Sequence, residues 1–432
     1  MHTKHNKITL ITLGCSKNLV DSENIITHLA NSGYDITHER GGKDTDTVII
    51  NTCGFIHDAK QESINTILQF ANLKRSGEIK HLYVTGCLSQ RYRDALRKEI
   101  PEVDDFTGTN INELLSKFNI DYKKSLLGER LISTPPHYAY LKIAEGCDRH
   151  CSFCAIPLIR GKHRSRSIDD IVTEAQHLAD KGVKELILIS QELTYYGLDM
   201  YGKRMLPALL DELVKIDGPE WIRLHYTYPG KFPMELIDTM AKHEKICNYL
   251  DIPLQHANDR ILKSMKRFSS KKDAVTIIEY ARKTIPDIAI RTTFIVGYPG
   301  ETQSEYEELL DFVKEMQFDR VGVFEYSHEE DTAAFELEDS ISEEEKKYRA
   351  AHLMEIQSDI SYEKNLEKTG QTLKVLIDKK EDGYYTGRTQ YDSPEVDNEV
   401  VIHATKPLNP GEFYNVKITD AEEYDLHAKV EY

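Results

Sequence analysis

Three apolar, strand-like runs near the N-terminus each end at a cysteine, and this pattern constrains the fold more than any other. The runs are ITLITLGC, DTVIINTC and HLYVTGC, which end at Cys15, Cys53 and Cys87. Each run is followed by a segment with helical spacing of its apolar residues. Such alternation predicts an open parallel sheet, in which the carboxyl ends of the strands share one edge. Three cysteines far apart in the sequence are therefore expected to meet in space.

The length and charge of the chain limit what the rest of it can be. A chain of 432 residues is too long to fold around one compact core, so we expect two or three domains. A net charge of -17 at pH 7 argues against broad binding to phosphate backbones and favours a basic protein as partner. Seven cysteines are too few and odd in number for a secreted disulfide framework. No apolar run approaches ~18 residues, and MHTKHNK does not lead into a signal-peptide core, so we expect a cytoplasmic protein.

Two further patterns follow the first sheet. After the linker STPPHY, six strand candidates alternate with helical segments from Tyr138 onward, which predicts a partial (β/α)6 barrel with its site at the C-terminal strand ends. From Thr372 short alternating runs separated by turns predict a small all-β barrel. The predicted division is an α/β N-terminal domain at 1–134, the partial barrel at 135–366 and the small barrel at 367–432.

A compact cysteine loop follows the first strand of the predicted barrel. Cys147, Cys151 and Cys154 form the pattern C-x3-C-x2-C. Three thiolates can hold three irons of a 4Fe-4S cubane and leave the fourth iron open, whereas an electron-transfer ferredoxin site supplies four cysteines. A structural zinc site completed by His150 or His163 is the alternative. The remaining cysteine, Cys247, has no companions and is expected in the core.

This loop, C-x3-C-x-aromatic-C with Phe153 in the aromatic place, resembles the radical S-adenosylmethionine (SAM) superfamily. The resemblance implies a 4Fe-4S cluster whose open iron binds the methionyl amine and carboxylate of SAM. Reductive cleavage of SAM then yields a 5′-deoxyadenosyl radical, so the cofactor carries the difficult chemistry and the protein positions it.

Other motifs occur in the order of that superfamily. The resemblance implies that Gln191 and Glu192, in LISQE, meet the methionyl amine, and that Arg291 pairs with the methionyl carboxylate. In FIVGYPGET, Gly297, Pro299 and Gly300 allow the backbone to approach the adenine closely. Each motif alone is also compatible with an ordinary turn or strand end.

The strand-end cysteines have two interpretations. A single such cysteine is most often a buried structural thiol. Three of them at equivalent strand ends suit a second cubane with an open iron. The motifs LGCSKNLVDSE, NTCGFI, GCLSQRY and EGCDRHCSFCAIPLIRGKHRSR resemble the methylthiotransferase family over essentially the whole chain. That resemblance implies two 4Fe-4S clusters, a C-terminal TRAM domain and transfer of a methylthio group, with an electron donor of low potential.

Two branches of that family differ in substrate. One modifies a tRNA adenosine (N6-isopentenyladenosine), and the other modifies the β-carbon of an aspartate in the twelfth small-subunit ribosomal protein. The motifs resemble the ribosomal-protein branch. Residues 365–432 hold 8 Lys and Arg against 14 Asp and Glu, which fits a basic protein partner better than tRNA, although these charges also serve to solvate the surface.

Two further alternatives remain open from the sequence. A non-catalytic iron-sulfur redox sensor that binds ribosomes through its terminal barrel explains the cysteines, but it does not explain SQE, Arg291 and GYPGE. Arg160, Arg164 and Arg166 follow the cysteine loop and are expected either to attract an acidic group of the substrate or to form a solvated basic loop.

Overall fold

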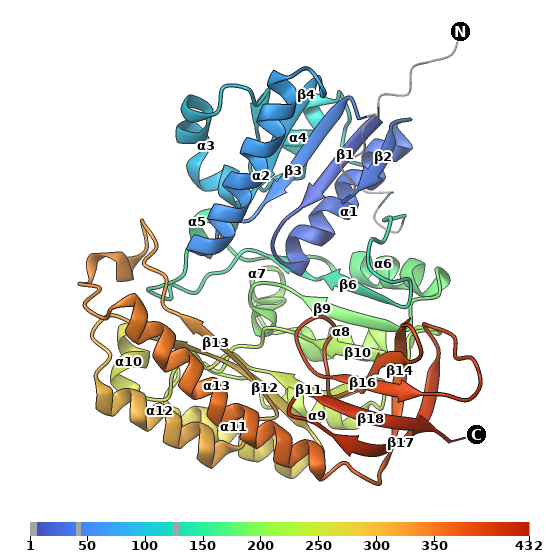
Figure 1. The fold of residues 1–432 in the computed structure, drawn as a ribbon, viewed down its shortest axis with the longest axis vertical. Helices are drawn as coiled ribbons and strands as arrows, with labels where there is room; N and C mark the ends of the chain where they lie inside the picture. The colour runs from blue at the N-terminus through green and yellow to red at the C-terminus, as the bar shows by residue number, and fades with distance from the viewer. Residues whose placement is uncertain (1–6, 40–44, 124–125, 127–128, 432) are drawn as a thin grey trace. The chain divides into compact units, whose positions relative to one another are not determined.

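The computed structural model describes residues 7–39, 45–123, 126 and 129–431 (Figure 1). The chain divides into two compact units. The first comprises Met1–Thr134, Tyr140–Arg149 and Ala155–His177, and the second comprises Pro135–Ala139, His150–Cys154 and Leu178–Tyr432. The first unit thus includes segments from the region assigned by sequence to the partial barrel. The three-part division at 134 and 366 stays a prediction.

The first unit is built on a five-stranded sheet with the order β2-β1-β3-β4-β5, in which every pairing is parallel. This confirms the open parallel sheet predicted from the three cysteine-terminated runs. The strands are β1 (Lys7–Thr12), β2 (Asp35–His38), β3 (Thr47–Thr52), β4 (His81–Gly86) and β5 (Asp105–Phe106), and the helices are α1 (Ser16–Asn31), α2 (His57–Arg75), α3 (Cys87–Glu99) and α4 (Ile111–Lys117).

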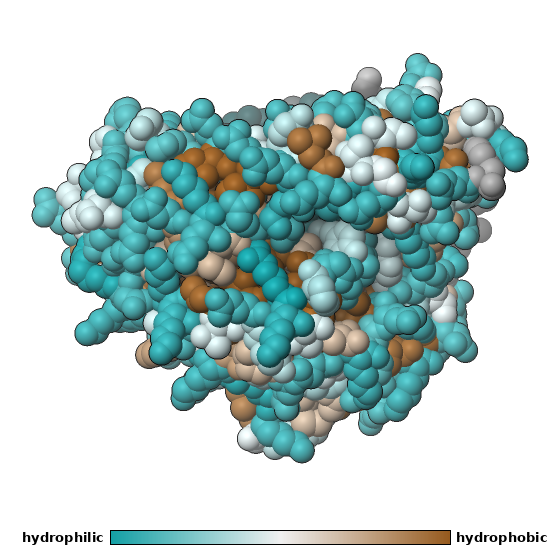
Figure 2. Space-filling model, turned by 90° about the horizontal axis from the view of Figure 1, so that it is seen from below, coloured by the Kyte–Doolittle hydropathy of each residue, from teal (hydrophilic) through white to brown (hydrophobic). Residues whose placement is uncertain are grey.

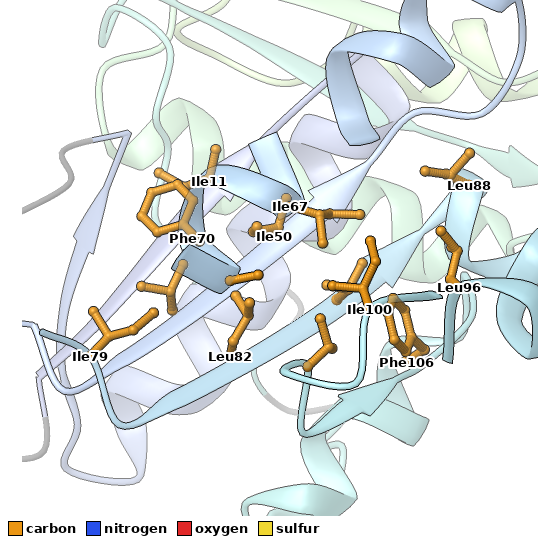
Figure 3. Close-up of a cluster of buried hydrophobic side chains, with 14 residues drawn as sticks. Ile11, Ile50, Ile67, Phe70, Ile79, Leu82, Leu88, Leu96, Ile100 and Phe106 are labelled. Atoms are coloured by element: carbon orange, nitrogen blue, oxygen red, sulfur yellow. The ribbon is translucent and has the colours of Figure 1, made fainter. Parts of the chain in front are cut away.

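Both faces of the inner strands β1 and β3 are buried, which explains why these strands are apolar without alternation, whereas the edge strand β2 stays partly exposed. On β3, Val48 and Ile50 join one core with Ile67 and Phe70 of α2 (Figure 3). Ile49 lies between them and joins a second core, which contains residues of α1 and α4. Because successive strand residues point to opposite faces, one strand supplies both cores.

A second sheet has six strands in the order β13-β12-β11-β10-β9-β6, as the sequence predicts for a partial barrel. The printed pairings from β9 to β13 are all parallel. The strands are β6 (Tyr138–Lys142), β9 (Glu185–Ile189), β10 (Trp221–Leu224), β11 (Ile246–Asp251), β12 (Ala289–Val296) and β13 (Arg320–Glu325).

Helices follow these strands. Two begin with a complete capping box, because Ser270 and Thr302 each accept from and donate to an acidic residue three positions later. The longer helices are α6 (Ile168–Asp180), α8 (Leu206–Leu213), α9 (Glu235–Lys242), α11 (Lys271–Thr284), α12 (Gln303–Met316) and α13 (Glu343–Leu366). The short elements are α5 (Ile156–Arg160), α7 (Leu198–Tyr201), α10 (Asp259–Ser264), the 3-10 turns η2 (Leu193–Tyr195) and η3 (Ala333–Glu336), and the hairpin β7 (Ala144–Glu145) and β8 (Arg164–Ser165).

The C-terminal region forms a closed barrel in the order β14-β15-β16-β18-β17, around a core that includes Val375, Val400 and Val416. Closure removes the sheet edges that an open sheet of this size leaves unpaired. The strands are β14 (Thr372–Lys380), β15 (Tyr385–Arg388), β16 (Glu399–His403), β17 (Phe413–Ala421) and β18 (Asp425–Val430). Four of them were predicted. The fifth, β18, pairs with β17 and, in parallel, with β16.

Hydrophilic residues dominate the face drawn in Figure 2, where hydrophobic ones form separate patches. Across the described ranges, no helix has the length and apolar character needed to cross a membrane.

Candidate metal centres

The fold brings the three strand-end cysteines to one edge of the first sheet. Cys15 follows β1 and occupies the N-cap position of α1, Cys53 follows β3, and Cys87 opens α3 directly after β4. Strands β1, β3 and β4 are neighbours, so their carboxyl ends lie side by side. We call these residues the strand-edge set. Cys15 is exposed, whereas Cys53 and Cys87 are buried.

The backbone is packed tightly around these thiols. A Cβ added at Gly14 would lie 2.9 Å from the Sγ of Cys53, so the residue before Cys15 already touches the second cysteine. Gly14 and Gly86 have φ of +91° and +95°, a region that favours glycine. The pKa of Cys87 is raised to about 11, chiefly by burial, with Arg160 lowering it and the nearby Cys15 and Cys53 contributing to the rise. The three thiols are therefore electrostatic neighbours.

Asn18 on α1 ties the strand ends together. Its Nδ2 donates to the carbonyl oxygens of Leu13 at 2.8 Å and Thr52 at 3.0 Å, just before Cys15 and Cys53. Its Oδ1 lies 3.6 Å from the Sγ of Cys87. Asn18 is fully buried. One amide thus fixes the approach of all three cysteines.

A buried cation lies against the same edge. The Nη2 of Arg160, on α5, lies 3.5 Å from the Sγ of Cys87 and donates to Asn18 Oδ1. Its Nη1 lies 2.6 Å from Asp21 Oδ2. The expectation of a solvent-facing, substrate-attracting or solvated loop is therefore wrong for Arg160, because two carboxylates and the protein interior enclose its guanidinium.

The other two arginines of that loop behave differently. Arg166 lies 2.6 Å from Glu174 and donates to the carbonyl oxygen of Lys142 at 2.7 Å. Arg164 is exposed on β8. Of the three arginines expected to act together, one is thus buried at the cysteines, one is paired nearby and one faces solvent.

The donor set of this edge fits an iron-sulfur cluster. Thiolate is the ligand that such clusters prefer, and hydrogen bonds to the sulfur tune them. Over the part of the chain that the structure describes, no three His, Cys, Asp or Glu side chains converge closely enough to coordinate a single ion. Three thiols at three adjacent strand ends match the three cysteine ligands of a cubane with an open iron. Asn18 and Asp21 were not singled out from sequence, although NLVDSE contains them, and Arg160 was named there only as part of a substrate-attracting or solvated loop.

The second set, Cys147, Cys151 and Cys154, is called the loop set. In the first unit, the Cys147 N–H donates to the carbonyl oxygen of Gly161 at 3.1 Å, and the Arg149 N–H donates to the Sγ of Cys147 at 3.4 Å. In the second unit, Nη1 of Arg267 lies 3.9 Å from the Sγ of Cys151. All three cysteines are half-buried. Sulfurs that accept N–H groups in a partly open loop fit thiolate ligation, and their convergence on one cluster stays a prediction.

The predicted SAM residues all lie in the second unit. Phe153 packs against a buried cluster that includes Ile295 and Tyr298. Gln191 and Glu192 directly follow β9, at the C-terminal strand end expected for a barrel site. Glu192 is buried and accepts a hydrogen bond from Thr194. Their contacts with SAM stay predictions.

The turn at Gly297, Pro299 and Gly300 is organised by a residue that the sequence analysis did not single out. Glu301 Oε2 accepts the N–H of Gly297 at 2.9 Å and that of Tyr298 at 3.3 Å. Its Oε1 lies 2.7 Å from Arg349 on α13. Glu301 therefore closes the turn, and its carboxylate in GYPGE was the available signal.

Arg291 is engaged by protein carboxylates. Its Nε lies 3.2 Å from Asp397 Oδ1, and its Nη1 lies 3.4 Å from Asp251 Oδ1. Asp397 belongs to the loop between β15 and β16, whose Asp392 also pairs with Arg320. A methionyl carboxylate at Arg291 would have to share the guanidinium with these groups, and that contact stays a prediction.

Three family models match successive parts of the chain. Residues 7–108 match the Uncharacterized protein family UPF0004, residues 141–313 match the Radical SAM superfamily, and residues 369–430 match the TRAM domain. These matches follow the order expected from the motifs.

Named relatives match over nearly the full length. The ribosomal protein uS12 methylthiotransferase RimO of Christiangramia forsetii is 55% identical over 428 residues, which cover 99% of this chain and 94% of that protein. The protein of the same name from Bacteroides thetaiotaomicron is 52% identical over 430 residues, covering 99% of each.

Solved structures show a shared fold at low identity. The radical S-adenosylmethionine methyltransferase TsrM from Kitasatospora setae, with tryptophan and a SAM analogue bound, superposes with a TM-score of 0.54 at 13% identity, covering 74% of this chain and 72% of TsrM. The cobalamin-dependent S-adenosylmethionine radical enzyme OxsB, with aqua-cobalamin bound, gives 0.53 at 10% identity, covering 77% and 55%.

Proposed function

The chain belongs to the family of ribosomal protein uS12 methylthiotransferases, and we propose that it adds a methylthio group to the β-carbon of an aspartate in that ribosomal protein. The observation that carries the proposal is the pair of cysteine sets within a chain that matches those enzymes over 99% of its length. The enzyme is a transferase that uses SAM and an iron-sulfur cluster.

The finer proposal is that the chain holds two 4Fe-4S clusters. The loop set would hold one and the strand-edge set the other, each with three thiolates and an open iron. When bound, these clusters supply the electron for reductive SAM cleavage and the site at which the transferred sulfur is methylated. The residues of the chain hold the thiolates in place, and Gln191, Glu192, Arg291 and the turn at Gly297 position SAM.

A radical route is what this substrate demands. The β-carbon of an aspartate side chain carries C–H bonds of low acidity, so a general base cannot remove a proton from it at a useful rate. Hydrogen abstraction by a carbon radical does not depend on that acidity. The low-potential donor that supplies the electron is a further proposed partner.

The charge of the C-terminal barrel supports a protein substrate. Three aspartates of the region already form ion pairs: Asp378 with Arg388, Asp392 with Arg320, and Asp397 with Arg291. One cation of the region, Arg388, is also withdrawn from the surface by burial. The remaining charges of residues 365–432 are still mostly acidic. An acidic surface attracts a basic ribosomal protein and repels a phosphate backbone.

A competition tests the substrate. Anaerobically reconstituted protein with reductant and SAM receives a peptide of the uS12 aspartate loop and an unmodified tRNA, and both are analysed by mass spectrometry. We expect a methylthio group on the peptide aspartate and none on the tRNA. Modification of the tRNA alone would contradict the proposed substrate and keep the two-cluster chemistry. Neither product, with no 5′-deoxyadenosine, would favour the redox sensor.

A further inference from the structure

The first unit contains a buried guanidinium that its catalytic motifs do not explain. The side chain of Arg160 is 2% exposed, and its Nη2 lies 3.5 Å from the Sγ of Cys87. Buried arginines are normally paired with carboxylates and do not contact other side chains that could bind a metal. Here one edge of the guanidinium faces Asp21 and Glu145, while the other faces Asn18 and a sulfur of the strand-edge set.

The anchors of Arg160 leave it little freedom. Asn18 and Asp21 are one turn apart on α1, so both reach the same guanidinium. Glu145 Oε2 lies 3.2 Å from Nη1 and 2.7 Å from Nζ of Lys142. Lys142 also pairs with Asp21. The network thus holds two cations and two carboxylates, and within it a cationic nitrogen is the group placed against the sulfur.

We propose that Arg160 is a positioning residue that raises the reduction potential of the cluster held by Cys15, Cys53 and Cys87, through the hydrogen bond of its Nη2 to Cys87 Sγ. The inference rests on the second cluster of the proposed function. Hydrogen bonds to cluster sulfurs, and positive charge beside them, favour the reduced and more negative state. In a buried site that charge is weakly screened, so its removal has a measurable effect.

The charge network predicts shifts of opposite sign in the reduction potential for two different variants. Arg160→Met removes the cation and leaves Asp21 and Glu145 opposite the cluster, so the potential falls. Asp21→Asn removes a carboxylate from the same network, so the potential rises. A general loosening of the site predicts no such reversal. Arg160→Lys keeps the charge and loses the two-pronged fork, and is expected between parent and Arg160→Met.

Arg130 offers a matched control in the same unit. It is also fully buried, and it lies 3.3 Å from Glu23 and 3.2 Å from Glu174. Arg130→Met therefore removes a buried, doubly paired arginine from elsewhere in the unit. It is expected to lower stability and to leave the potential of the cluster where it was.

The measurement uses the full chain with Cys147, Cys151 and Cys154 replaced by Ala, so that only the strand-edge cluster contributes. Iron content is determined first, with about four irons per chain expected, and the midpoint potential is then read by a redox titration followed by electron paramagnetic resonance. We expect Arg160→Met to reduce the equilibrium constant for reduction about tenfold, which is about 59 mV for a one-electron couple.

Each outcome decides something. A parent chain without iron overturns the proposed second cluster itself, and the inference with it. A parent with full iron whose potential is the same in Arg160→Met and in Asp21→Asn overturns the inference alone. If Arg160→Met fails to hold iron, Asp21→Asn and Arg160→Lys still decide the sign, because both keep the cation beside Cys87. An equal shift in Arg130→Met would also overturn it.

Discussion

The two cysteine sets differ in how the chain delivers them. The loop set lies within eight consecutive residues, and its cysteines are half-buried. The strand-edge set spans residues 15–87 and is assembled by three parallel strands, with two of its thiols buried beside Arg160. Local spacing makes the first set readable as a motif. The strand-edge set can be recognised only when the order of the strands in the sheet is known.

The surroundings of the two cysteine sets differ in the same way as their burial. The loop set has N–H donors and Arg267 near its sulfurs in a partly exposed loop. In the strand-edge set, Cys53 and Cys87 are enclosed by glycine backbone, Asn18 and a buried ion-pair network, whereas Cys15 is exposed. An open site suits a cofactor that exchanges each turnover, whereas an enclosed site suits controlled delivery of a reactive sulfur. The predictions below test this division, from the largest expected effect to the smallest.

The largest effect is expected at the loop set. Replacing Cys151 with Ala removes one of its three thiolates, and reductive SAM cleavage should be lost completely. The measurement is 5′-deoxyadenosine formed under anaerobic, reducing conditions, quantified by liquid chromatography. Cys247→Ala is the control, because Cys247 is buried in the core and is expected to leave cleavage intact. Cleavage in the Cys151 variant at the parent rate would contradict the assignment.

Replacing Cys53 with Ala should separate the two sets. We expect abortive cleavage of SAM to 5′-deoxyadenosine to continue, because the loop set is intact, while methylthio transfer to the uS12 peptide stops. Both products are measured in one reaction by mass spectrometry. Normal methylthio transfer by this variant would show that the strand-edge set is not a sulfur-delivering centre.

Thiol reactivity in the reduced, metal-free chain sharpens the contrast in burial. The pKa of Cys87 is about 11 instead of the ordinary 9.0, chiefly because of burial, so at pH 8 its thiolate fraction is about a hundredfold lower than that of an ordinary thiol. Since the thiol stays protonated until the pH nears 11, its alkylation rate should rise about tenfold per pH unit from 8 to 10.

Iodoacetamide labelling resolved by cysteine in a mass spectrometer measures this. Cys15, which is exposed, should be labelled first. The control is the same labelling in denaturant, where Cys87 loses its burial and should react about as fast as Cys15. Equal rates in the folded chain would contradict the enclosed environment.

The sequence predicted elements whose signal is local. Strands β1, β3 and β4 of the first sheet, the repeated strand and helix segments of the partial barrel and four strands of the terminal barrel were read from apolar runs and turns, whereas the edge strands β2 and β5 were not predicted. Strand β18, with sequence DLHAKV, was not singled out, although Leu426, Ala428 and Val430 alternate with polar residues as in a half-buried strand. Its parallel pairing with β16 across the barrel is not readable from that pattern.

The sequence predicted those parts of the candidate site in which the residue type and its spacing in the chain form a motif. The meeting of Cys15, Cys53 and Cys87 at one sheet edge was predicted and is confirmed, the role of the six cysteines as cluster ligands stays a prediction, and the burial of Arg160 was not foreseen. Its partners Asp21 and Asn18 lie 139 and 142 residues away along the chain. A basic loop sequence looks the same whether its arginine faces water or a carboxylate. Glu301 was missed for a different reason, since a carboxylate that closes its own turn resembles a surface residue until the backbone is known.

The smallest effect tests how tightly the strand-edge backbone is packed. Gly86, which precedes Cys87, has φ of +95°, and an added Cβ would lie 2.5 Å from the carbonyl oxygen of Thr52. Gly33 has φ of +89° with nothing within 4 Å. Alanine at either position meets the strain of a positive φ, about 1 kcal/mol or more, and the ψ of -160° at Gly86 adds to it there. Only Gly86→Ala adds a clash with buried backbone, so we expect its total cost to reach about 3 kcal/mol.

Urea unfolding of the two full-length variants, followed by circular dichroism, compares these costs. Both variants carry the cost of a positive φ, so the extra loss in Gly86→Ala reports the packing around Cys87 together with the unusual ψ of Gly86. A larger loss in Gly86→Ala means that the edge cannot widen to admit one methyl group, as an enclosed cluster site requires. Equal losses would mean that the strand ends yield easily, and the contrast between an enclosed strand-edge set and an open loop set would then rest on burial alone.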